Sequence, residues 1–561
     1  MKQHSKACHG VFALLMVLGP GVSGCKSEPP ADLILTGGRV YTMNPEQPRA
    51  EAVAVRGDRI VFVGGREGAL AKKGPGTKIL DLEGMTTLPG LIDAHGHLPN
   101  LGRTLRELKL LGTSSSSEIR EMVIARRKQV AAGEWIAGRG WDQNDWQVQE
   151  FPTWQDLHGT EDNPVYLRRV DGHAVWVNRR ALELCGVTRD TPDPEGGRIV
   201  RDEEGQPTGV FVDRAVDLVS SRIPKPSMEE RIERVRVAIR ECRRYGLTGV
   251  HDAGTTEDYL GVYRRLLEDG ELTLRVYTML DCDSTRFVRA RLEEGPWADP
   301  QHFVTVRAIK VYADGAMGSR GAMLLEPYSD EPSNRGLLQN PRHTIEEWAG
   351  LALEGGFQMC AHAIGDGGNR LILDVYETAL RARPVSNHRF RVEHAQLLAL
   401  DDIPRFASMA VIASMQPTHA TSDMYWAEDR VGAERIQGAY AWRKLLRSGA
   451  VIACGSDFPV ESVNPLWGVY AAVTRQDHSE WPEGGWYPDE RMTVYEAIEG
   501  FTTAAAFASF EEHLKGSIEP GKFADFTIVD HDLFEIAPGE ILETSVRYTI
   551  VGGKVVYSAA E

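Results

Sequence analysis

The middle of the chain alternates eight short apolar segments with helical patterns, and this alternation constrains the fold more than any other feature. The apolar segments lie at 91–97, 248–253, 274–280, 308–313, 358–362, 391–394, 411–416 and 451–455. Helical periodicity fills most of the intervening stretches, for example 228–245 and 344–354. Strands that alternate with helices form parallel sheets, and eight such units can close into a barrel. We therefore predict an α/β fold with a TIM-like (β/α)8 barrel within residues 86–512.

One connection in this series is too long to be a loop. Residues 98–246 separate the first and second predicted barrel strands, and we expect an inserted subdomain there. Short strands with glycine-containing turns precede the barrel within 32–85 and follow it within 513–561. This pattern is typical of antiparallel sheets. We predict that both ends of the chain together form one small β-sandwich.

The N-terminus has the features of a bacterial export signal. Two lysines precede a short apolar stretch at 11–22, and small residues follow it. The tetrad Val-Ser-Gly-Cys that ends at Cys25 resembles a lipobox, in which the cysteine is lipidated. We therefore expect 1–24 to be a signal peptide, 25–31 a tether, and the protein to be lipid-anchored in the bacterial cell envelope, on its periplasmic or outer surface. An uncleaved anchor and an ordinary signal peptide are the alternatives.

Charge and cysteine content exclude two classes of protein. The net charge is −17 and no basic block follows the N-terminus, so a nucleic-acid partner is not expected. No later apolar segment is long enough to span a bilayer, so contact with the membrane is expected through the lipid anchor only. The sequence does not indicate an oligomeric state. The cysteines after Cys25 are odd in number and widely spaced, which argues against a disulfide framework: Cys185, Cys242, Cys282, Cys360 and Cys454.

Five residues with metal-binding chemistry lie at or near the ends of predicted barrel strands. His95 and His97 are two apart on an extended segment, so both imidazoles can point to one face. His362, His394 and Asp457 end later apolar segments. Active sites of such barrels lie at the carboxyl ends of the strands, where imidazoles and carboxylates can hold zinc and activate water. Solvent-facing or buried structural histidines, and an aspartate that caps a helix, are the alternatives.

Lys310 is the unusual member of the series, because an ammonium group cannot ligate a cation. A lysine whose pKa is lowered by burial can instead react with carbon dioxide. The resulting carbamate has two oxygens and can bridge two metal ions. The alternative is an ion pair with Asp314 on the following turn.

The chain resembles the amidohydrolase superfamily, in particular the branch similar to N-substituted formamide deformylase, over essentially everything after the anchor. The resemblance implies that His95 and His97 bind a first metal ion and that carbamylated Lys310 bridges to a second. It implies that His362 and His394 bind the second ion and that Asp457 is both ligand and catalytic base. The motifs that carry it are Pro89-Gly-Leu-Ile-Asp-Ala-His-Gly-His97, Asp314-Gly-Ala-Met-Gly-Ser-Arg320, His362-Ala-Ile-Gly-Asp366, Glu393-His394, Gly455-Ser-Asp457 and Lys515-Gly-Ser-Ile-Glu-Pro-Gly-Lys-Phe-Ala-Asp525.

The resemblance leads us to expect a metal-dependent hydrolase of non-peptide C–N bonds, with one or two divalent ions, zinc first among them, and a small amide or formamide as substrate. Hydrolysis of esters, lactones or phosphoesters on the same barrel is one alternative, and a non-catalytic surface-binding lipoprotein is another. His173 or His251 could steady an oxyanion, or be structural polar groups. The remaining candidates could line a substrate pocket or simply pack in the core, and the sequence favours neither role: Trp141, Asp142, Trp146, Tyr425 and Trp426.

Overall fold

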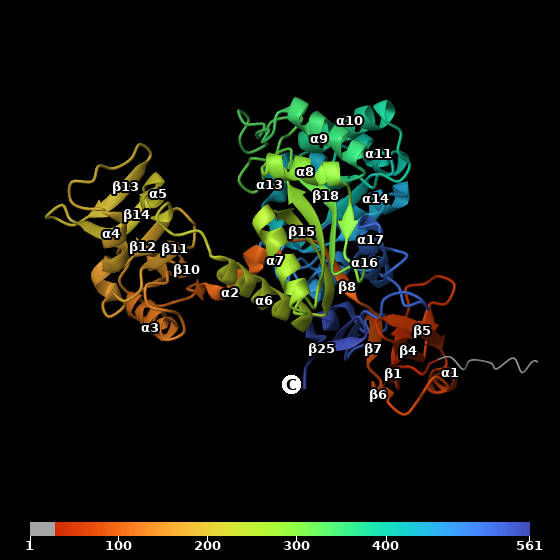
Figure 1. Cartoon of the computed structure of the whole chain (residues 1–561). Coiled ribbons are helices and arrows are strands. Elements are labelled where there is room, and N and C mark those ends of the chain that lie inside the picture. The colour runs from red at the N-terminus through yellow and green to blue at the C-terminus, as the bar shows by residue number, and fades with distance from the viewer. Residues whose placement is uncertain (1–28, 561) are drawn as a thin grey trace, which may run out of the picture.

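The computed structural model describes residues 29–560 and contains a barrel, a β-sandwich and an inserted subdomain (Figure 1). The insertion stands to one side of the barrel, and the sandwich lies below it, where the two ends of the chain meet. The predicted signal peptide and Cys25 lie outside the described residues. Ala31, which we assigned to the tether, is buried and its backbone N–H donates to the Lys72 carbonyl, so the tether ends before it.

Eight parallel strands form the barrel, each hydrogen-bonded to the next along the series, and the fold class predicted from the sequence is confirmed. All eight predicted segments are strands. A ninth strand, β17 (Trp297–Ala298), pairs antiparallel with the start of the fourth barrel strand, at Thr305 and Val306. In order, the barrel strands are β8 (Leu91–Gly96), β15 (Leu247–Thr255), β16 (Arg275–Asp281), β18 (Val304–Tyr312), β19 (Gln358–Ala363), β20 (Arg391–His394), β21 (Ile412–Met415) and β22 (Ile452–Cys454).

The barrel closes through the segment that follows β22 rather than through a regular ladder. The backbone N–H of Asp457 donates to the His95 carbonyl at 2.7 Å, and that of His97 donates to the Phe458 carbonyl at 2.8 Å. Gly455 allows this close approach, because a Cβ there would lie 2.5 Å from the backbone nitrogen of His95. The last strand is therefore joined to the first at the rim where the candidate ligands lie.

Helices cover the outside of the barrel and bury its main apolar core against the strands. The long helix α6 (Met228–Arg244) begins with a capping box, in which Ser227 and Glu230 each accept a hydrogen bond from the other's backbone. The helices after β15 are α7 (Glu257–Glu268), α8 (Thr285–Glu294), α9 (Arg342–Gly355), α10 (Asp366–Ala382), α11 (Ile403–Ser408), α12 (Pro417–Asp423), α13 (Ala427–Arg435), α14 (Trp442–Ser448), α15 (Pro465–Thr474), α16 (Val494–Gly500) and α17 (Thr503–Ala508).

Two sheets form the sandwich, one of N-terminal strands and one of strands from both ends of the chain, and apolar residues of both sheets share one core. We set the end of its N-terminal part at residue 85, which is four residues too early. Strand β7 (Thr86–Pro89) pairs with strands from both ends of the chain. One sheet contains β5 (Arg59–Gly64), β4 (Ala52–Arg56), β1 (Leu33–Thr36) and β6 (Lys78–Asp81), flanked by α1 (Arg66–Leu70); the other contains β25 (Lys554–Ser558), β24 (Val546–Val551), β23 (Phe526–Val529), β7, β2 (Arg39–Tyr41) and β3 (Arg49–Ala50).

The insertion contains a six-stranded mixed sheet with an apolar core on each face. Its stalk is the helix pair α2 (Leu98–Arg106) and α6 (Met228–Arg244), which pack against each other and connect it to the barrel (Figure 1). Its sheet runs in the order β13 (Gly197–Arg201), β14 (Pro207–Asp213), β12 (Ala174–Val177), β11 (Val165–Arg169), β10 (Ile136–Trp141) and β9 (Leu108–Lys109), with α3 (Ser116–Arg127), α4 (Arg179–Cys185) and α5 (Asp217–Ser220) against it.

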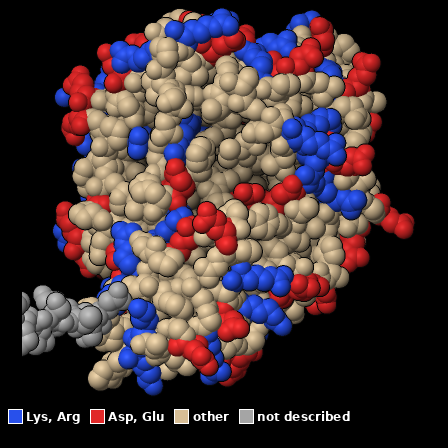
Figure 2. All heavy atoms as spheres, turned by 90° about the vertical axis from the view of Figure 1, so that its right-hand side faces the viewer, with Lys and Arg blue, Asp and Glu red and all other residues tan. Residues whose placement is uncertain are grey.

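The described cysteines form no disulfide bond, as the sequence predicts, and the surface carries charges of both signs. Acidic and basic side chains are intermingled around the margin of the face in Figure 2, and uncharged residues surround the hollow near its centre. The five cysteines of the described chain are all buried and free. Within residues 29–560 we find no helix with both the length and the apolar character needed to cross a bilayer.

A buried ion pair fastens the barrel to the sandwich, and we predict that its loss is costly. Arg275 on β16 donates two hydrogen bonds to Asp525, at 2.6 and 3.0 Å, and both side chains are almost fully buried. Replacing Asp525→Ala leaves the Arg275 charge uncompensated and should lower the free energy of unfolding by about 3–5 kcal/mol. Denaturant unfolding measures this. The control Asp269→Ala breaks the exposed Arg265–Asp269 pair and should change stability by less than about 0.5 kcal/mol; equal effects would contradict the prediction.

Candidate metal centre

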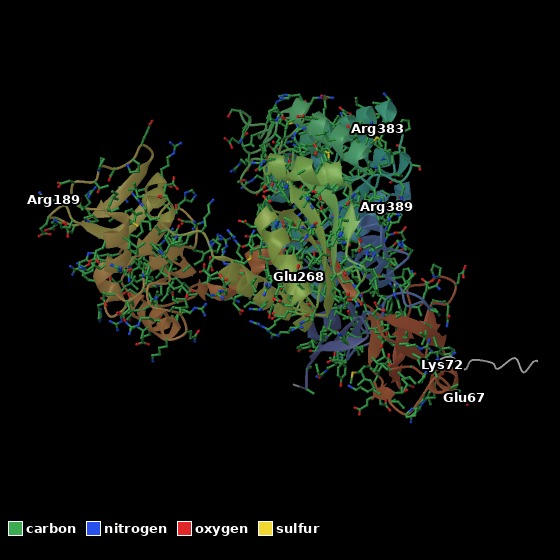
Figure 3. The ribbon with its side chains drawn as sticks, in the orientation of Figure 1. Glu67, Lys72, Arg189, Glu268, Arg383 and Arg389 are labelled. Carbon is green, nitrogen blue, oxygen red and sulfur yellow. The ribbon has the colours of Figure 1, made fainter. Side chains whose placement is uncertain are left out.

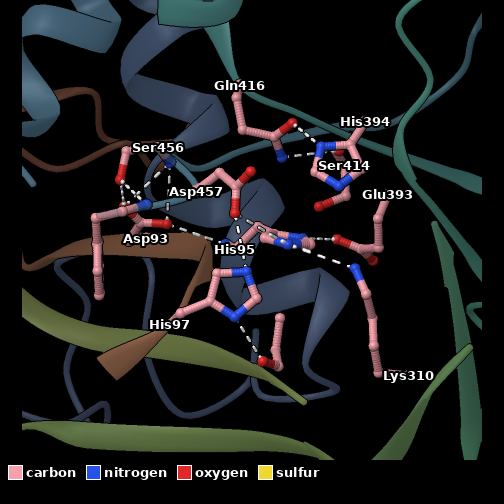
Figure 4. A network of polar contacts seen from close by, with 12 residues as sticks. Asp93, His95, His97, Lys310, Glu393, His394, Ser414, Gln416, Ser456 and Asp457 are labelled. Atoms are coloured by element: carbon pink, nitrogen blue, oxygen red, sulfur yellow. Dashed lines mark hydrogen bonds and ion pairs between the residues drawn. The ribbon is translucent and has the colours of Figure 1, made fainter. Parts of the chain in front are cut away.

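The structure brings the six candidate residues together at the carboxyl ends of the barrel strands. They line one cavity of about 360 Å³, and Figure 4 shows five of them in a single network of polar contacts. The parallel strands explain this convergence, because their carboxyl ends share one rim. The six are His95, His97, Lys310, His362, His394 and Asp457.

Three of the imidazoles are oriented by hydrogen bonds at Nδ1. His95 Nδ1 lies 2.5 Å from Glu393 Oε2, His97 Nδ1 lies 2.8 Å from the Ala253 carbonyl, and His394 Nδ1 lies 2.8 Å from Gln416 Oε1. Each partner is an acceptor, so each Nδ1 carries the proton and donates. The Nε2 lone pairs are therefore left free. Such orientation by the second nitrogen is typical of metal-binding histidines.

The free lone pairs lie close to one another and to the Asp457 carboxylate, and a cation would relieve the repulsion between them. His97 Nε2 lies 3.0 Å from Asp457 Oδ1, and His95 Nε2 lies 3.7 Å from the same oxygen. Asp457 Oδ1 and His362 Nε2 are buried without a hydrogen-bond partner among the described residues. One nitrogen each from His95 and His97 and one oxygen of Asp457 lie within 4.8 Å of one another. These groups fit a divalent ion, because unpaired buried acceptors are otherwise costly.

Lys310 projects from β18 into the same space. Its ammonium nitrogen lies 3.4 Å from His95 Nε2, and the side chain is only 1% exposed. Burial lowers its pKa. The ion pair with Asp314, which the sequence left open, does not form. Asp314 instead accepts hydrogen bonds from the backbone N–H groups of Met323, Ile364 and Gly365.

Asp457 is held as an anion by its surroundings. Burial by itself would raise its pKa, but the histidines that surround it lower it well below the usual value. Its backbone lies in the left-handed region at φ +59°, a strained conformation for a residue other than glycine. Asp93 supports the turn before it, since it accepts hydrogen bonds from the backbone N–H and the hydroxyl of Ser456.

A buried arginine holds the acceptor of His95 in place. Arg391 donates from Nε to Glu393 Oε1 at 2.7 Å and from Nη2 to Oε2 at 2.9 Å, and both residues are fully buried. Arg391 also donates to the Ala94 carbonyl and to the Ser414 hydroxyl. Although burial raises the pKa of Glu393, Arg391 and His95 together lower it. The carboxylate is therefore available to orient the imidazole of His95.

His419 lines the same cavity and was missed from the sequence. It lies on α12, three residues into the helix, rather than at a strand end, so the strand pattern gave no indication of it. The Gln396 amide donates to His419 Nδ1 at 2.9 Å, which places the ring proton on Nε2. That Nε2 is buried without a hydrogen-bond partner among the described residues and lies 3.8 Å from Asp457 Oδ2. His419 therefore offers a donor to whatever occupies the cavity.

The insertion supplies none of the residues around this cavity, so three predicted pocket residues were wrong. Trp141 is fully buried in one core of the insertion, and its indole N–H donates to the Leu167 carbonyl. Asp142 forms an ion pair with Arg169 at 2.6 Å. His173 is exposed on the same subdomain and pairs with Asp213. Trp146 also packs in this core, which agrees with the packing alternative.

Of the predicted pocket residues in the barrel, only Trp426 lines the cavity. Tyr425 is 55% exposed, its hydroxyl donates a hydrogen bond to Asp477, and its ring stacks on Trp481, so the side chain lies outside the cavity. His251 is buried deeper in the barrel, where its Nδ1 accepts from Arg391 at 2.9 Å. It cannot steady an oxyanion in this cavity.

The paired Arg391 and Glu393 generate a prediction about stability. Glu393→Gln removes the charge that compensates Arg391, and we expect the free energy of unfolding to fall by about 3 kcal/mol or more. Denaturant unfolding of the purified protein measures this. Glu268 is exposed on α7 (Figure 3), and Glu268→Gln should change stability by less than about 0.5 kcal/mol. Equal stability of the two variants would mean that the pair is not a structural support.

Comparison with known proteins identifies the family. The model of the amidohydrolase family matches residues 78–557. Amidohydrolase YtcJ of Bacillus subtilis strain 168 is 34% identical over 530 residues, which cover 93% of this chain and 98% of that protein. N-substituted formamide deformylase of Arthrobacter pascens is 26% identical over 547 residues, which cover 94% of this chain and 98% of the relative.

A solved structure agrees with this match. An uncharacterized metal-dependent hydrolase of Pyrococcus furiosus has a TM-score of 0.76 and 28% identity, over 90% of this chain and 100% of that one. The match to the family model extends over most of the chain, from the sandwich through the barrel and back to the sandwich. The chain belongs to the amidohydrolase family of metal-dependent hydrolases.

Proposed function

We propose that this chain hydrolyses a carbon–nitrogen bond other than a peptide bond, in an N-substituted amide or formamide. The observation that carries the proposal is the meeting of an anionic Asp457 with three oriented imidazoles at one rim. A carboxylate in that position can take a proton from water and return it to a departing nitrogen. The name of the relative from Arthrobacter pascens supports the choice of an N-substituted formamide.

We propose zinc as the metal, bound by His95, His97 and Asp457, with His362, His394 and Lys310 available for a second ion. Imidazole and carboxylate ligands suit zinc. When bound, the metal would supply hydroxide at neutral pH and polarise the carbonyl of the substrate. The orientation of His95 through Glu393 and Arg391 fits this role, because such supports raise metal affinity.

Lys310 is proposed to carry a carbamate. Its nitrogen would bond to the carbon of carbon dioxide and release one proton, which leaves an anion with two ligand oxygens. Only a neutral amine can react in this way, and the burial of Lys310 favours the neutral form. The missing ion pair with Asp314 supports the proposal, because a paired ammonium would keep its proton.

His419 is proposed to position the substrate. Its Nε2–H faces the cavity beside Asp457 and has no other acceptor among the described residues. A donor in a buried site stabilises negative charge that develops on a carbonyl oxygen. His419 takes the role that the sequence suggested for His173 or His251.

The charge around the cavity points to an uncharged or cationic substrate. Apart from Lys310, no lysine or arginine of the described chain lines it, whereas Glu461 and Asp423 do. Met317 and Trp426 contribute apolar surface. Away from the metal ligands, a carboxylate on the substrate would find no lysine or arginine among the described lining residues and would face Glu461 and Asp423.

The role of Asp457 can be tested by Asp457→Asn. The amide keeps an oxygen that can ligate the metal but cannot accept the proton, so we expect retained metal and a loss of turnover of about 10²–10⁴-fold. Metal analysis and hydrolysis of N-formyl and N-acyl compounds measure both. Chelation should abolish activity and added zinc should restore it. Full activity of the variant, or turnover of esters or phosphotriesters without turnover of amides, would contradict the proposal.

The charge preference can be tested with matched substrates. A neutral N-arylalkyl formamide should have a kcat/KM at least about tenfold higher than the same molecule with an added carboxylate, because like charges repel in the cavity. Glu461→Gln should narrow this ratio, whereas the surface variant Glu268→Gln should leave it unchanged. A preference for the carboxylate substrate in the unaltered enzyme would contradict the assignment.

Location in the cell envelope is proposed from the sequence alone, since Cys25 lies outside the described residues. If Cys25 is lipidated, Cys25→Ser should move the full-length protein from the membrane fraction to the soluble fraction. Fractionation and immunoblotting detect this movement. Persistence in the membrane fraction would indicate another anchor.

A further inference from the structure

Three basic residues lie side by side across the sheet of the insertion. Arg139 on β10 is in register with Lys109 on β9 and with Arg168 on β11. Register partners in neighbouring strands project to the same face of a sheet. Like charges placed directly opposite each other destabilise a sheet. The row therefore needs a counter-charge.

The described residues provide no ion pair for any member of this row. The Arg168 side chain donates a hydrogen bond to the hydroxyl of Tyr166, at 3.1 Å, and its guanidinium lies over the Tyr166 ring, 5.9 Å from the centroid. Arg139 and Lys109 are exposed. Elsewhere in the insertion arginines do find carboxylates, as Arg169 does with Asp142. The row thus lacks the counter-charge that the neighbouring Arg169 has.

Two members of the row, Arg139 and Arg168, line a cavity of about 370 Å³ at the junction between the insertion and its stalk. Its walls come from the sheet face, from α2 and α6 of the stalk, and from α3. Six arginines and three glutamates line it, an excess of three positive charges in a chain whose net charge is −17. The charged residues are Arg103, Arg106, Arg126, Arg139, Arg168, Arg234, Glu107, Glu134 and Glu230.

The glutamates do not neutralise the cavity. The ion pairs Arg106–Glu134 and Arg103–Glu107 are long, at 3.6 and 3.8 Å, and Glu230 caps α6. Arg126 forms no ion pair among the described residues. Burial lowers its pKa, and the adjacent Arg106 lowers it further. Guanidinium groups are thus crowded together where an anion would stabilise them.

We propose that this junction cavity binds a small phosphate-bearing anion. Guanidinium groups recognise both carboxylates and phosphates. A carboxylate is planar and one guanidinium can satisfy it. A phosphate group presents oxygens in several directions, which matches arginines that approach from the sheet face, α2, α3 and α6. The volume is in the range of small-molecule sites, about 300–1,000 Å³.

The site is separate from the metal centre but connected to it by one helix. Helix α2 begins at Leu98, directly after His97, and carries Arg103 and Arg106 into the junction cavity. The proposal does not depend on the substrate of the enzyme. Binding can therefore be measured without any assay of hydrolysis.

The test is calorimetric titration of the full-length protein with inorganic pyrophosphate in low-salt, phosphate-free buffer, together with thermal melts. We expect binding that weakens as sodium chloride is added, because screening reduces attraction between charges. Arg168→Gln should weaken binding by about tenfold or more, as expected for a lost charge-assisted hydrogen bond. It should also raise the Tm of the ligand-free protein, since it removes repulsion within the row.

Two further variants make the outcome decisive. Arg139→Gln changes the exposed member of the row that lines the cavity and should weaken binding without lowering the Tm, even if Arg168→Gln fails to fold. Arg189→Gln alters an exposed arginine on the far side of the insertion (Figure 3) and should leave binding unchanged. No binding of pyrophosphate, or equal binding by all variants, would overturn the site. Citrate that binds as tightly as pyrophosphate would overturn the phosphate assignment.

Discussion

The repulsion between free imidazole nitrogens and the Asp457 carboxylate is the constraint on which the candidate site depends. His97 Nε2 and Asp457 Oδ1 are 3.0 Å apart, and the proton of His97 is used on Nδ1 for the Ala253 carbonyl. Two acceptors at that distance are stabilised by a positive charge between or beside them, either a metal ion or a second proton on His97. The backbone contact of Asp457 with His95 also closes the barrel. The same contact therefore completes the fold and assembles the metal-binding groups.

A buried ion pair beneath the site holds the metal-binding groups in position. Arg391 compensates Glu393, and Glu393 orients His95, all without exposure to solvent. Buried ion pairs seldom add much stability compared with apolar packing, but they fix orientation and are costly to break. Removing one partner should therefore affect the site and the barrel together. In the insertion, by contrast, the basic row of Lys109, Arg139 and Arg168 has no carboxylate partner among the described residues.

Features encoded locally could be predicted from the sequence, whereas those set by distant contacts could not. Each barrel strand is an apolar segment, and His95, His362 and His394 end such segments, so their common rim follows from parallel strands alone. The predicted boundary between the sandwich and the barrel, at residue 85, was wrong because Thr86–Pro89 and β8 form one continuous apolar segment in the sequence. Only Gly90 separates them, where a Cβ would lie 2.2 Å from the Thr248 hydroxyl.

The pocket residues could not be predicted reliably, because they depend on where whole subdomains and helices lie in the fold. Nothing local distinguishes Trp141 in the core of the insertion from a tryptophan that lines a cavity, because the difference lies in where the subdomain stands. His419 lies on a helix, and only the fold brings it beside Asp457. The carbamate on Lys310 and the anchor at Cys25 remain predictions.

Anomalous diffraction at the zinc absorption edge, from crystals of the zinc-loaded protein, tests the central claim most directly. The account predicts a peak at coordination distance, about 2.1 Å, from Nε2 of both His95 and His97 and from an oxygen of Asp457. Zinc bound only elsewhere in the molecule, or an empty cavity in protein that contains stoichiometric zinc, would contradict it.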